Sequence, residues 1–212
     1  MGKIVKDALI LFAITLVAGV LLGVVYEVTK EPIAEQNELA KQRAYKAVMA
    51  DAESFEKIEY SLENAQKLVN DAGLSADEVS EVVAGVKGGK IIGFVVTVVA
   101  GDGYAGDIKF SVGVSTEGKV LGTSILSIGE TPGLGMRAQQ DPSFLAQFKD
   151  KIVEKFTVVK DGTGSSADDK IDAIGGSTIT SNAMTNGINA ALVVYKDLVE
   201  SKVKTEGGVG IE

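Results

Sequence analysis

An uncharged apolar segment near the N-terminus places the strongest constraint on this chain of 212 residues. Residues 8–26 read ALILFAITLVAGVLLGVVY and contain no charged side chain. As an α-helix with a rise of about 1.5 Å per residue, the segment spans about 28 Å, close to the ~30 Å hydrocarbon core of a bilayer. Gly19 and Gly23 form a small-xxx-small pair of the kind that lipid-embedded helices tolerate. We therefore predict a transmembrane helix over 8–26, preceded by a short cytoplasmic stretch, 1–7.

The alternative for this segment is a cleaved signal peptide. The apolar run is longer than the ~7–15 residues of a usual signal core, and the residues that follow, YEVTK at 26–30, offer no small-x-small cleavage site. Lys3 and Lys6 precede the span, so the positive-inside rule places the N-terminus in the cytoplasm. We expect a single-pass protein of the cell (inner) membrane whose remaining residues lie on the extracytoplasmic side.

The composition excludes several kinds of chemistry. The chain contains no Cys and no His. Disulfides, Cys-ligated iron–sulfur clusters and Cys/His zinc sites therefore cannot form, and catalysis by a Ser–His or Cys–His pair is excluded. The net charge of −8 makes nucleic-acid binding unfavourable, because phosphates would be repelled. A fixed cofactor would have to be held through hydroxyls, carboxylates, cationic side chains or backbone groups.

Residues 27–78 have the pattern of a helical connector. Pro32 suits the first turn of a helix that leads away from the membrane over about 32–50, and a second helix is predicted over 63–72, ending at Gly73. The acidic pairs Asp77/Glu78 and Asp168/Asp169 lie in polar stretches and read as solvated surface.

From Val79 onward the pattern is that of a mixed domain. Runs rich in Val, Ile and Thr predict strands, and short Gly-containing turns between them favour antiparallel pairing. The predicted strands are 82–87, 91–100, 107–115 and 120–127, and the predicted helices are 143–155 and 180–203. We predict an α+β domain over 79–205, an antiparallel sheet flanked by helices, followed by a loose tail, 206–212.

One segment combines a short strand, two glycines, hydroxyls and a helix. Residues 172–181 read DAIGGSTITS. Gly175 and Gly176 allow a ligand to approach the backbone closely, and a helix N-terminus with its unpaired N–H groups can hold a phosphate. The alternative is an ordinary helix cap without a ligand, because Ser and Thr are favoured N-cap residues.

Two further loops are candidates for the same site. Residues 129–137, GETPGLGMR, form a rigid turn between a strand and a helix, and their backbone N–H groups and apolar side chain could line a flat ring. The loop GYAG at 103–106 exposes Tyr104, which could lie at a cofactor edge or a partner surface. Each loop could instead be purely structural.

Taken together, these segments resemble the FMN-binding family of respiratory ion pumps, in particular the G subunit of the Rnf electron-transport complex. The resemblance covers the apolar helix, the TKEP sequence after it, the GYAG loop, the ETPGLG loop and the final Thr-Ser helix. The family attachment motif is Asp-x-x-Ser-Gly-Ala-Thr. Asp172 and Gly176 match it and Thr178 falls on the attachment position, whereas Gly175 stands in place of Ser and Ser177 in place of Ala.

The resemblance implies a covalent FMN, esterified through its phosphate to Thr178. Backbone N–H groups near 176–180 would balance the phosphate charge, and 130–135 would line the isoalloxazine. No residue of the chain is expected to act as a catalyst, and no metal site is expected. The candidate cofactor contacts are Tyr104, Glu130, Thr131, Pro132, Gly133, Leu134, Gly135, Asp172, Gly175, Gly176, Ser177, Thr178, Thr180 and Ser181.

The resemblance also implies partners. A separate flavin transferase would attach the FMN, using FAD and Mg²⁺ and releasing AMP. The chain would act as a redox subunit of an ion-translocating ferredoxin:NAD⁺ oxidoreductase, with ferredoxin and NAD bound by other subunits of the complex. Two alternatives are the C subunit of the Na⁺-translocating NADH:quinone reductase and a membrane-tethered binding module without redox function.

Overall fold

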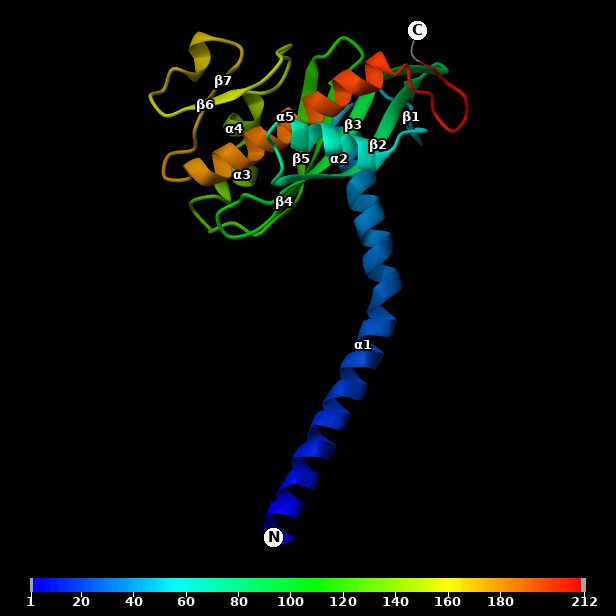
Figure 1. Cartoon of the computed structure of the whole chain (residues 1–212), viewed down its shortest axis with the longest axis vertical. Helices are drawn as coiled ribbons and strands as arrows, with labels where there is room; N and C mark the ends of the chain where they lie inside the picture. Colours follow the sequence, from blue (N-terminus) through cyan, green and yellow to red (C-terminus); the bar gives the residue numbers. More distant parts are fainter. Residues whose placement is uncertain (1, 211–212) are drawn as a thin grey trace. The chain divides into compact units, whose positions relative to one another are not determined.

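The computed structural model describes residues 2–210 of the chain. The chain divides after Gln42 into two compact units. The first unit is most of helix α1 (Gly2–Val48), and the second unit, from Arg43 onward, contains every other helix and strand (Figure 1).

Helix α1 is long and apolar enough to cross a membrane, which agrees with the predicted span. None of the residues in its apolar window is buried. The prediction that Pro32 opens a separate helix is wrong, because Pro32 lies inside α1. Proline removes one backbone hydrogen bond from a helix interior, but the residues after it are mostly strong helix formers, and the helix continues to Val48.

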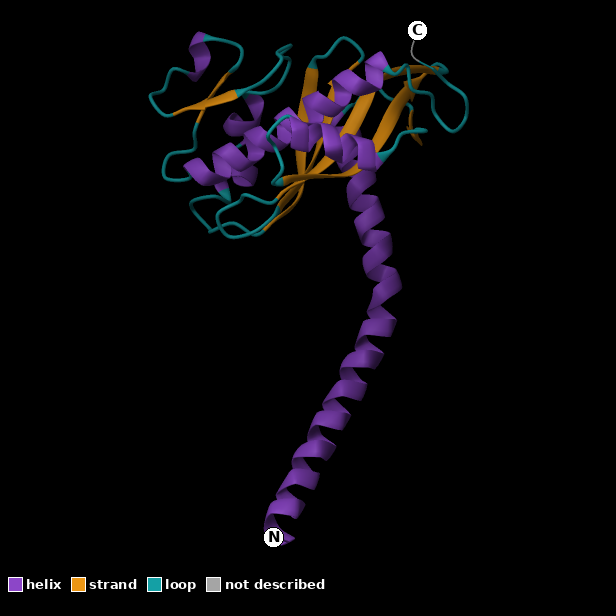
Figure 2. Ribbon diagram, in the orientation of Figure 1, coloured by secondary structure: helices purple, strands orange, loops and turns teal. Residues whose placement is uncertain are grey.

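The second unit is built on a five-stranded antiparallel sheet in the order β1-β2-β3-β4-β5 (Figure 2). The predicted antiparallel α+β fold is confirmed. Gly88 and Gly89, both at positive φ, form the tight turn between the two longest strands. The strands are β1 (Ser54–Lys57), β2 (Asp77–Lys87), β3 (Lys90–Ala100), β4 (Ile108–Ser115) and β5 (Val120–Ile128).

Both faces of the sheet are covered, as the alternation along its strands requires. Val82, Ala84 and Val86 point into the main core, where helices α2 (Leu62–Asp71) and α5 (Thr178–Glu200) pack. Val83 and Val95 point to the opposite face and contact a smaller cluster that includes Tyr45, Val48 and Met49. The last turn of α1 therefore belongs to the packed unit.

The boundary of the packed unit lies at Arg43, earlier than the predicted boundary at Val79. Two elements of the predicted connector are part of this unit: β1 pairs with β2, and α2 packs on β2 and α5. Strand β1 has four residues and a mixed burial pattern, so its sequence carries little periodic signal.

The predicted helix over 143–155 is wrong for most of its length. Only α4 (Pro142–Ala146) forms, directly after α3 (Arg137–Gln140). The next residues bond to β5 instead: Asp150 N donates to Val120 O (2.7 Å), and Val120 N donates to Lys151 O (2.9 Å). A helix here would leave the start of β5 without these partners.

A small parallel pair precedes α5. Strands β6 (Thr157–Val159) and β7 (Lys170–Asp172) pair side by side, with the short helix η1 (Gly164–Ser166) in the loop between them. Ile171 of β7 is fully buried. This arrangement carries the chain from the core to the N-terminus of α5.

Candidate functional site

Thr178 is the first residue of α5, and a tight turn sets its position. Ser177 N donates to Ile174 O (2.8 Å), which closes the turn between β7 and the helix. Gly176 has φ +79°, a conformation that a side chain disfavours. Thr178 itself is half-buried, so this hydroxyl residue stands at the surface of the turn.

Ser181 fastens this turn from inside the helix. Its hydroxyl accepts a hydrogen bond from Ile174 N (2.9 Å) and donates one to Ser177 O (2.9 Å). Ser181 is fully buried. The family resemblance makes Ser181 a candidate cofactor contact; in the structure the Ser181 hydroxyl holds the two sides of the turn together, and the position of Thr178 depends on it.

The N-terminus of α5 has no side-chain cap. Ser177 occupies the N-cap position but makes no capping hydrogen bond, and its buried hydroxyl has no partner among the described residues. The N–H groups of a first helical turn lack intrahelical acceptors and carry partial positive charge. The start of this helix is therefore suited to accept an anionic oxygen, as a phosphate would supply.

A cavity of about 410 Å³ opens beside this helix start. Its volume falls in the usual range of small-molecule sites. Three segments that are far apart in sequence form its walls, and the sequence predicts all three as candidates. The lining residues are Tyr104, Glu130, Thr131, Leu134, Gly135, Gly176, Ser177, Thr178 and Ile179.

Glu130 joins two of these segments. Glu130 is only 4% exposed, and its Oε1 accepts a hydrogen bond from Tyr104 N (2.7 Å). Its other oxygen, Oε2, has no hydrogen-bond partner in the described part of the chain. A buried carboxylate oxygen without a partner is costly, so Oε2 is available to a donor from a ligand in the cavity.

Position 135 requires glycine because a side chain has no room there, and not because of its backbone conformation. A Cβ built on Gly135 would lie 2.5 Å from Glu130 Oε2 and 2.7 Å from Thr180 Oγ1. Thr180 is buried and does not line the cavity. The loop therefore packs directly against α5, and any side chain at 135 would push the cavity wall outward.

The rim of the cavity is apolar and exposed. Tyr104, Leu134 and Ile179 are 69%, 46% and 51% exposed, respectively. Ile179 was not predicted as a site residue. The signal that could have identified it is an apolar side chain in the exposed first turn of a helix. The cavity suits a planar aromatic ligand that carries a phosphate. It offers apolar side chains at the rim, two polar atoms without partners on Ser177 and Glu130, and an uncapped helix end.

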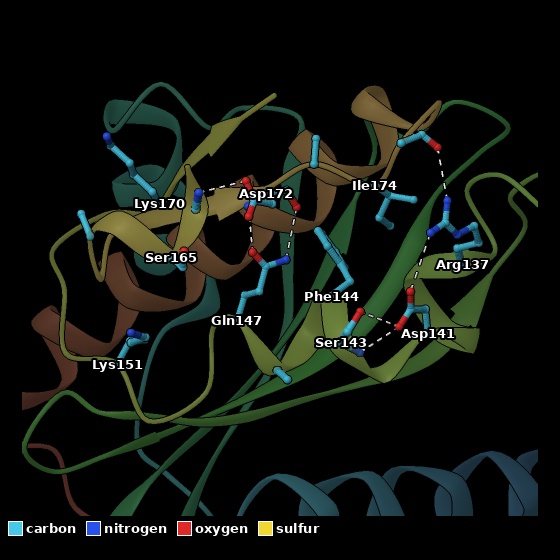
Figure 3. Close-up of a pocket in the computed structure, with 15 residues that line it drawn as sticks. Arg137, Asp141, Ser143, Phe144, Gln147, Lys151, Ser165, Lys170, Asp172 and Ile174 are labelled. Atoms are coloured by element: carbon cyan, nitrogen blue, oxygen red, sulfur yellow. Dashed lines mark hydrogen bonds and ion pairs between the residues drawn. The ribbon is translucent and has the colours of Figure 1, made fainter. Parts of the chain in front are cut away.

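Other candidate residues lie outside the lining of this cavity. Pro132 and Gly133 form the turn of the 130–135 loop, where Leu134 N and Met136 N both donate to Thr131 O. Gly175 and Asp172 line a second cavity of about 510 Å³ instead (Figure 3).

The contacts in this second cavity are structural. The Asp172 carboxylate accepts a hydrogen bond from Gly164 N (2.9 Å), and Gln147 pairs with the Asp172 backbone through both of its amide atoms (Figure 3). Arg137 donates to Gly175 O (3.4 Å). Asp172 thus fixes β7 to the preceding loop and supports the turn before α5, and it is not among the residues that line the first cavity.

Comparison with known families agrees with this site. The FMN-binding domain family matches residues 103–193, which include all three cavity segments. The RnfG N-terminal region family matches residues 1–48, nearly the same stretch as α1. The G subunit of the Na⁺-translocating ferredoxin:NAD⁺ oxidoreductase complex of Acetobacterium woodii is 34% identical over 194 residues, covering 91% of this chain and 92% of that protein. The chain belongs to the RnfG family.

Other relatives give the same picture. The G subunit of the proton-translocating ferredoxin:NAD⁺ oxidoreductase complex of Clostridium ljungdahlii is 36% identical over 195 residues, covering 88% of this chain and 92% of that protein. Among solved structures, the C subunit of the Na⁺-translocating NADH-quinone reductase of Parabacteroides distasonis has a TM-score of 0.54 at 21% identity, covering 80% of this chain and 96% of that chain. The RnfG chain and that quinone-reductase protein share a fold.

Proposed function

We propose that this RnfG chain is the FMN-carrying electron-transfer subunit of an ion-translocating ferredoxin:NAD⁺ oxidoreductase complex, with the FMN phosphate esterified to Thr178. The observation that carries the proposal is the position of Thr178: a half-buried hydroxyl residue at the first position of an uncapped helix, on the wall of a cavity with the size and lining of a flavin site. The family match supports FMN as the ligand.

The chain's own residues would hold and orient the cofactor. The N–H groups of the first turn of α5 would balance the phosphate charge. The side chains of Leu134, Ile179 and Tyr104 would contact the ring, and Glu130 Oε2 would accept a hydrogen bond from it. FMN, when bound, supplies the electron transfer; the protein supplies position and electrostatics.

Attachment would require an outside catalyst. The new bond joins Thr178 Oγ1 to the FMN phosphorus, the pyrophosphate of FAD is cleaved, AMP leaves, and the hydroxyl proton passes to a base on the transferase. Two ionisable side chains line the cavity, Tyr104 and Glu130, and neither has a hydrogen bond to the Thr178 hydroxyl in the described structure that would activate it. A separate flavin transferase is therefore part of the proposal.

In vitro attachment tests this step. Full-length chain produced without a transferase is expected to be colourless. Incubation with FAD, Mg²⁺ and a flavin transferase should raise its mass by one FMN less one water and release one AMP per chain. Covalent flavin that forms without the transferase, or flavin that is lost on denaturation after the reaction, would contradict the proposal.

The orientation in the membrane is a separate proposal. The cationic residues Lys3 and Lys6 before the apolar stretch support a cytoplasmic N-terminus and an extracytoplasmic FMN domain. Protease added to intact spheroplasts is expected to digest the domain, whereas a cytoplasmic control protein stays intact. Protection of the domain until the spheroplasts are lysed would reverse the orientation.

Two other functions are less well supported. The C subunit of a Na⁺-translocating NADH:quinone reductase shares the fold, but the relatives at 34–36% identity are G subunits of ferredoxin:NAD⁺ oxidoreductase complexes. A non-redox binding module would have no use for the Thr178 turn and the flavin-sized cavity together. Ferredoxin and NAD would bind to other subunits of the complex.

A further inference from the structure

Asp77 is a buried carboxylate without hydrogen-bond partners. It is the first residue of β2 and is 1% exposed, and neither of its side-chain oxygens has a partner within residues 2–210. The sequence suggests a solvated surface pair with Glu78; that prediction is wrong for Asp77, although Glu78 is exposed. Burying an unpaired carboxylate in its charged form is strongly unfavourable.

Hydrogen bonds on both sides fix the backbone of Asp77. Asp77 N donates to Leu74 O (3.0 Å), and Gln66 Nε2 donates to Asp77 O (2.8 Å). Gln66 also accepts from Val79 N through its amide oxygen (3.0 Å). Asp77 is thus fixed between α2 and the neighbouring strand β3, where its Cα pairs with that of Ala100.

A second carboxylate lies next to Asp77. Asp102 follows Ala100 by two residues; its Oδ1 is buried without a partner in the described structure, and its Oδ2 accepts a hydrogen bond from Asn186 on α5 (3.1 Å). Gly101 N donates to Ala76 O (2.9 Å), so the residues that precede Asp102 and Asp77 are hydrogen-bonded to each other, and the negative charge of Asp102 raises the pKa of Asp77. The two carboxylates are close together, and both oxygens of Asp77 lack hydrogen-bond partners in the described structure. One proton shared by the pair would cancel part of their combined negative charge.

The groups that face this pair are neutral or acidic. Burial raises the pKa of Asp77 to about 7, and the negative charge of Asp102 acts in the same direction. From α2 and β2, Glu63 and Glu78 line the same surface cavity as Asp77. From the loop after β3, Asp107 Oδ1 lies 3.9 Å from a Cβ built on Gly101, and from α5 the facing group is the neutral amide of Asn186.

We propose that Asp77 and Asp102 form a proton-binding site that controls the loop 101–106. With the proton bound, the pair carries one negative charge and the loop stays against the sheet. Above neutral pH the proton is released to solvent, the two carboxylates repel, and Asp102 moves with its loop. This site does not depend on the presence of FMN.

The loop connects the proton site to the cavity. Tyr104, two residues after Asp102, lies on the cavity wall, and its N–H donates to Glu130. Gly103 is packed tightly, since a Cβ built there would lie 2.1 Å from Gly106 O. A displacement of Asp102 therefore reaches Tyr104 through a short and compact loop.

The chain contains no Trp, so a Trp introduced at position 104 would report the loop's surroundings without background from other Trp residues. In full-length, flavin-free Tyr104→Trp protein in detergent, the emission is expected to titrate once between about pH 6 and 8, around the raised pKa of Asp77. Asp77→Asn and Asp102→Asn should each abolish this transition, because either substitution leaves a single carboxylate and removes the repulsion that moves the loop. The matched control Glu78→Gln, an exposed carboxylate beside Asp77, should leave the transition unchanged.

Stability gives an independent readout. The raised pKa of Asp77 means that its contribution to folding is fully present below about pH 4, the usual pKa of an aspartate, and is lost as the pH rises through about 7. Asp77→Asn should therefore match the parent's melting temperature near pH 4 and exceed it increasingly as the pH rises to about 8.

Three results would overturn the proposal. The first is a Tyr104→Trp transition that persists with Asp77→Asn, and the second is no transition in the parent protein. The third is a midpoint that moves when Na⁺ or K⁺ replaces choline at constant ionic strength, which would show a metal cation in place of the proton. If Asp77→Asn fails to fold, Asp102→Asn decides the matter, and a transition that persists in Asp102→Asn would contradict the proposal.

Discussion

Thr178→Ala is expected to abolish covalent flavin attachment completely. The substitution removes the hydroxyl oxygen that would become the ester, and the neighbouring Ser177 is only 6% exposed. When the full chain is coexpressed with a flavin transferase, the parent should give a fluorescent band in a denaturing gel and a mass increase of one FMN less one water. Thr178→Ala should show neither.

Two matched variants make this result specific. Thr178→Ser keeps a hydroxyl at the same helix position and is expected to retain attachment, at a lower rate because the serine rotamer is less restricted. Ser177→Ala removes the only adjacent hydroxyl and should be flavinylated like the parent. Loss of flavin in Ser177→Ala, together with retention in Thr178→Ala, would move the attachment point to Ser177.

Gly135→Ala is expected to disrupt the cavity and reduce flavin incorporation several-fold. The added methyl group would collide with Glu130 and Thr180, both of which are buried. Overpacking of this kind usually costs about 1–3 kcal/mol in the free energy of unfolding. The measurements are flavin absorbance per chain after in vitro attachment and the midpoint of thermal unfolding.

The control for this prediction is Gly129→Ala in the same loop. Apart from the two residues next to it in the chain, no described residue has an atom within 4 Å of a Cβ built on Gly129, and its φ is not positive. Gly129→Ala should therefore bind flavin as the parent does. Equal flavin content in the two variants would show that the contact of Gly135 with Glu130 and Thr180 does not shape the site.

The parts of the fold that the sequence predicted are those with strong local signals. The apolar run of α1, the alternating β-branched residues of β2 to β5 and the hydroxyl-to-helix transition at Thr178 are each recognisable within a short window. Strands β1 and β6 were missed because they have only four and three residues, whereas β7 overlaps the short strand predicted before Gly175. The predicted helix does not form over 147–155 because residues there hydrogen-bond to β5 instead, and no local sequence pattern encodes that pairing.

The candidate site shows the same division. The sequence identified the three segments that form the cavity wall, because glycines, a proline and hydroxyls mark them. The sequence did not distinguish residues that line the cavity from residues that stabilise the turn. Ser181 and Asp172 stabilise the turn, and Ile179 lies on the rim although it was not predicted. The burial of Asp77 depends on α2 and the loop after β3, which lie apart from it in sequence.

The most direct test of the central claim is peptide mapping by tandem mass spectrometry of the chain purified from its native membranes. We expect a peptide that includes 172–181 to carry one FMN less one water, with fragment ions that assign the modification to Thr178. The modification on Ser177 or Thr180, or an unmodified peptide together with flavin that is released on denaturation, would contradict the phosphoester at Thr178.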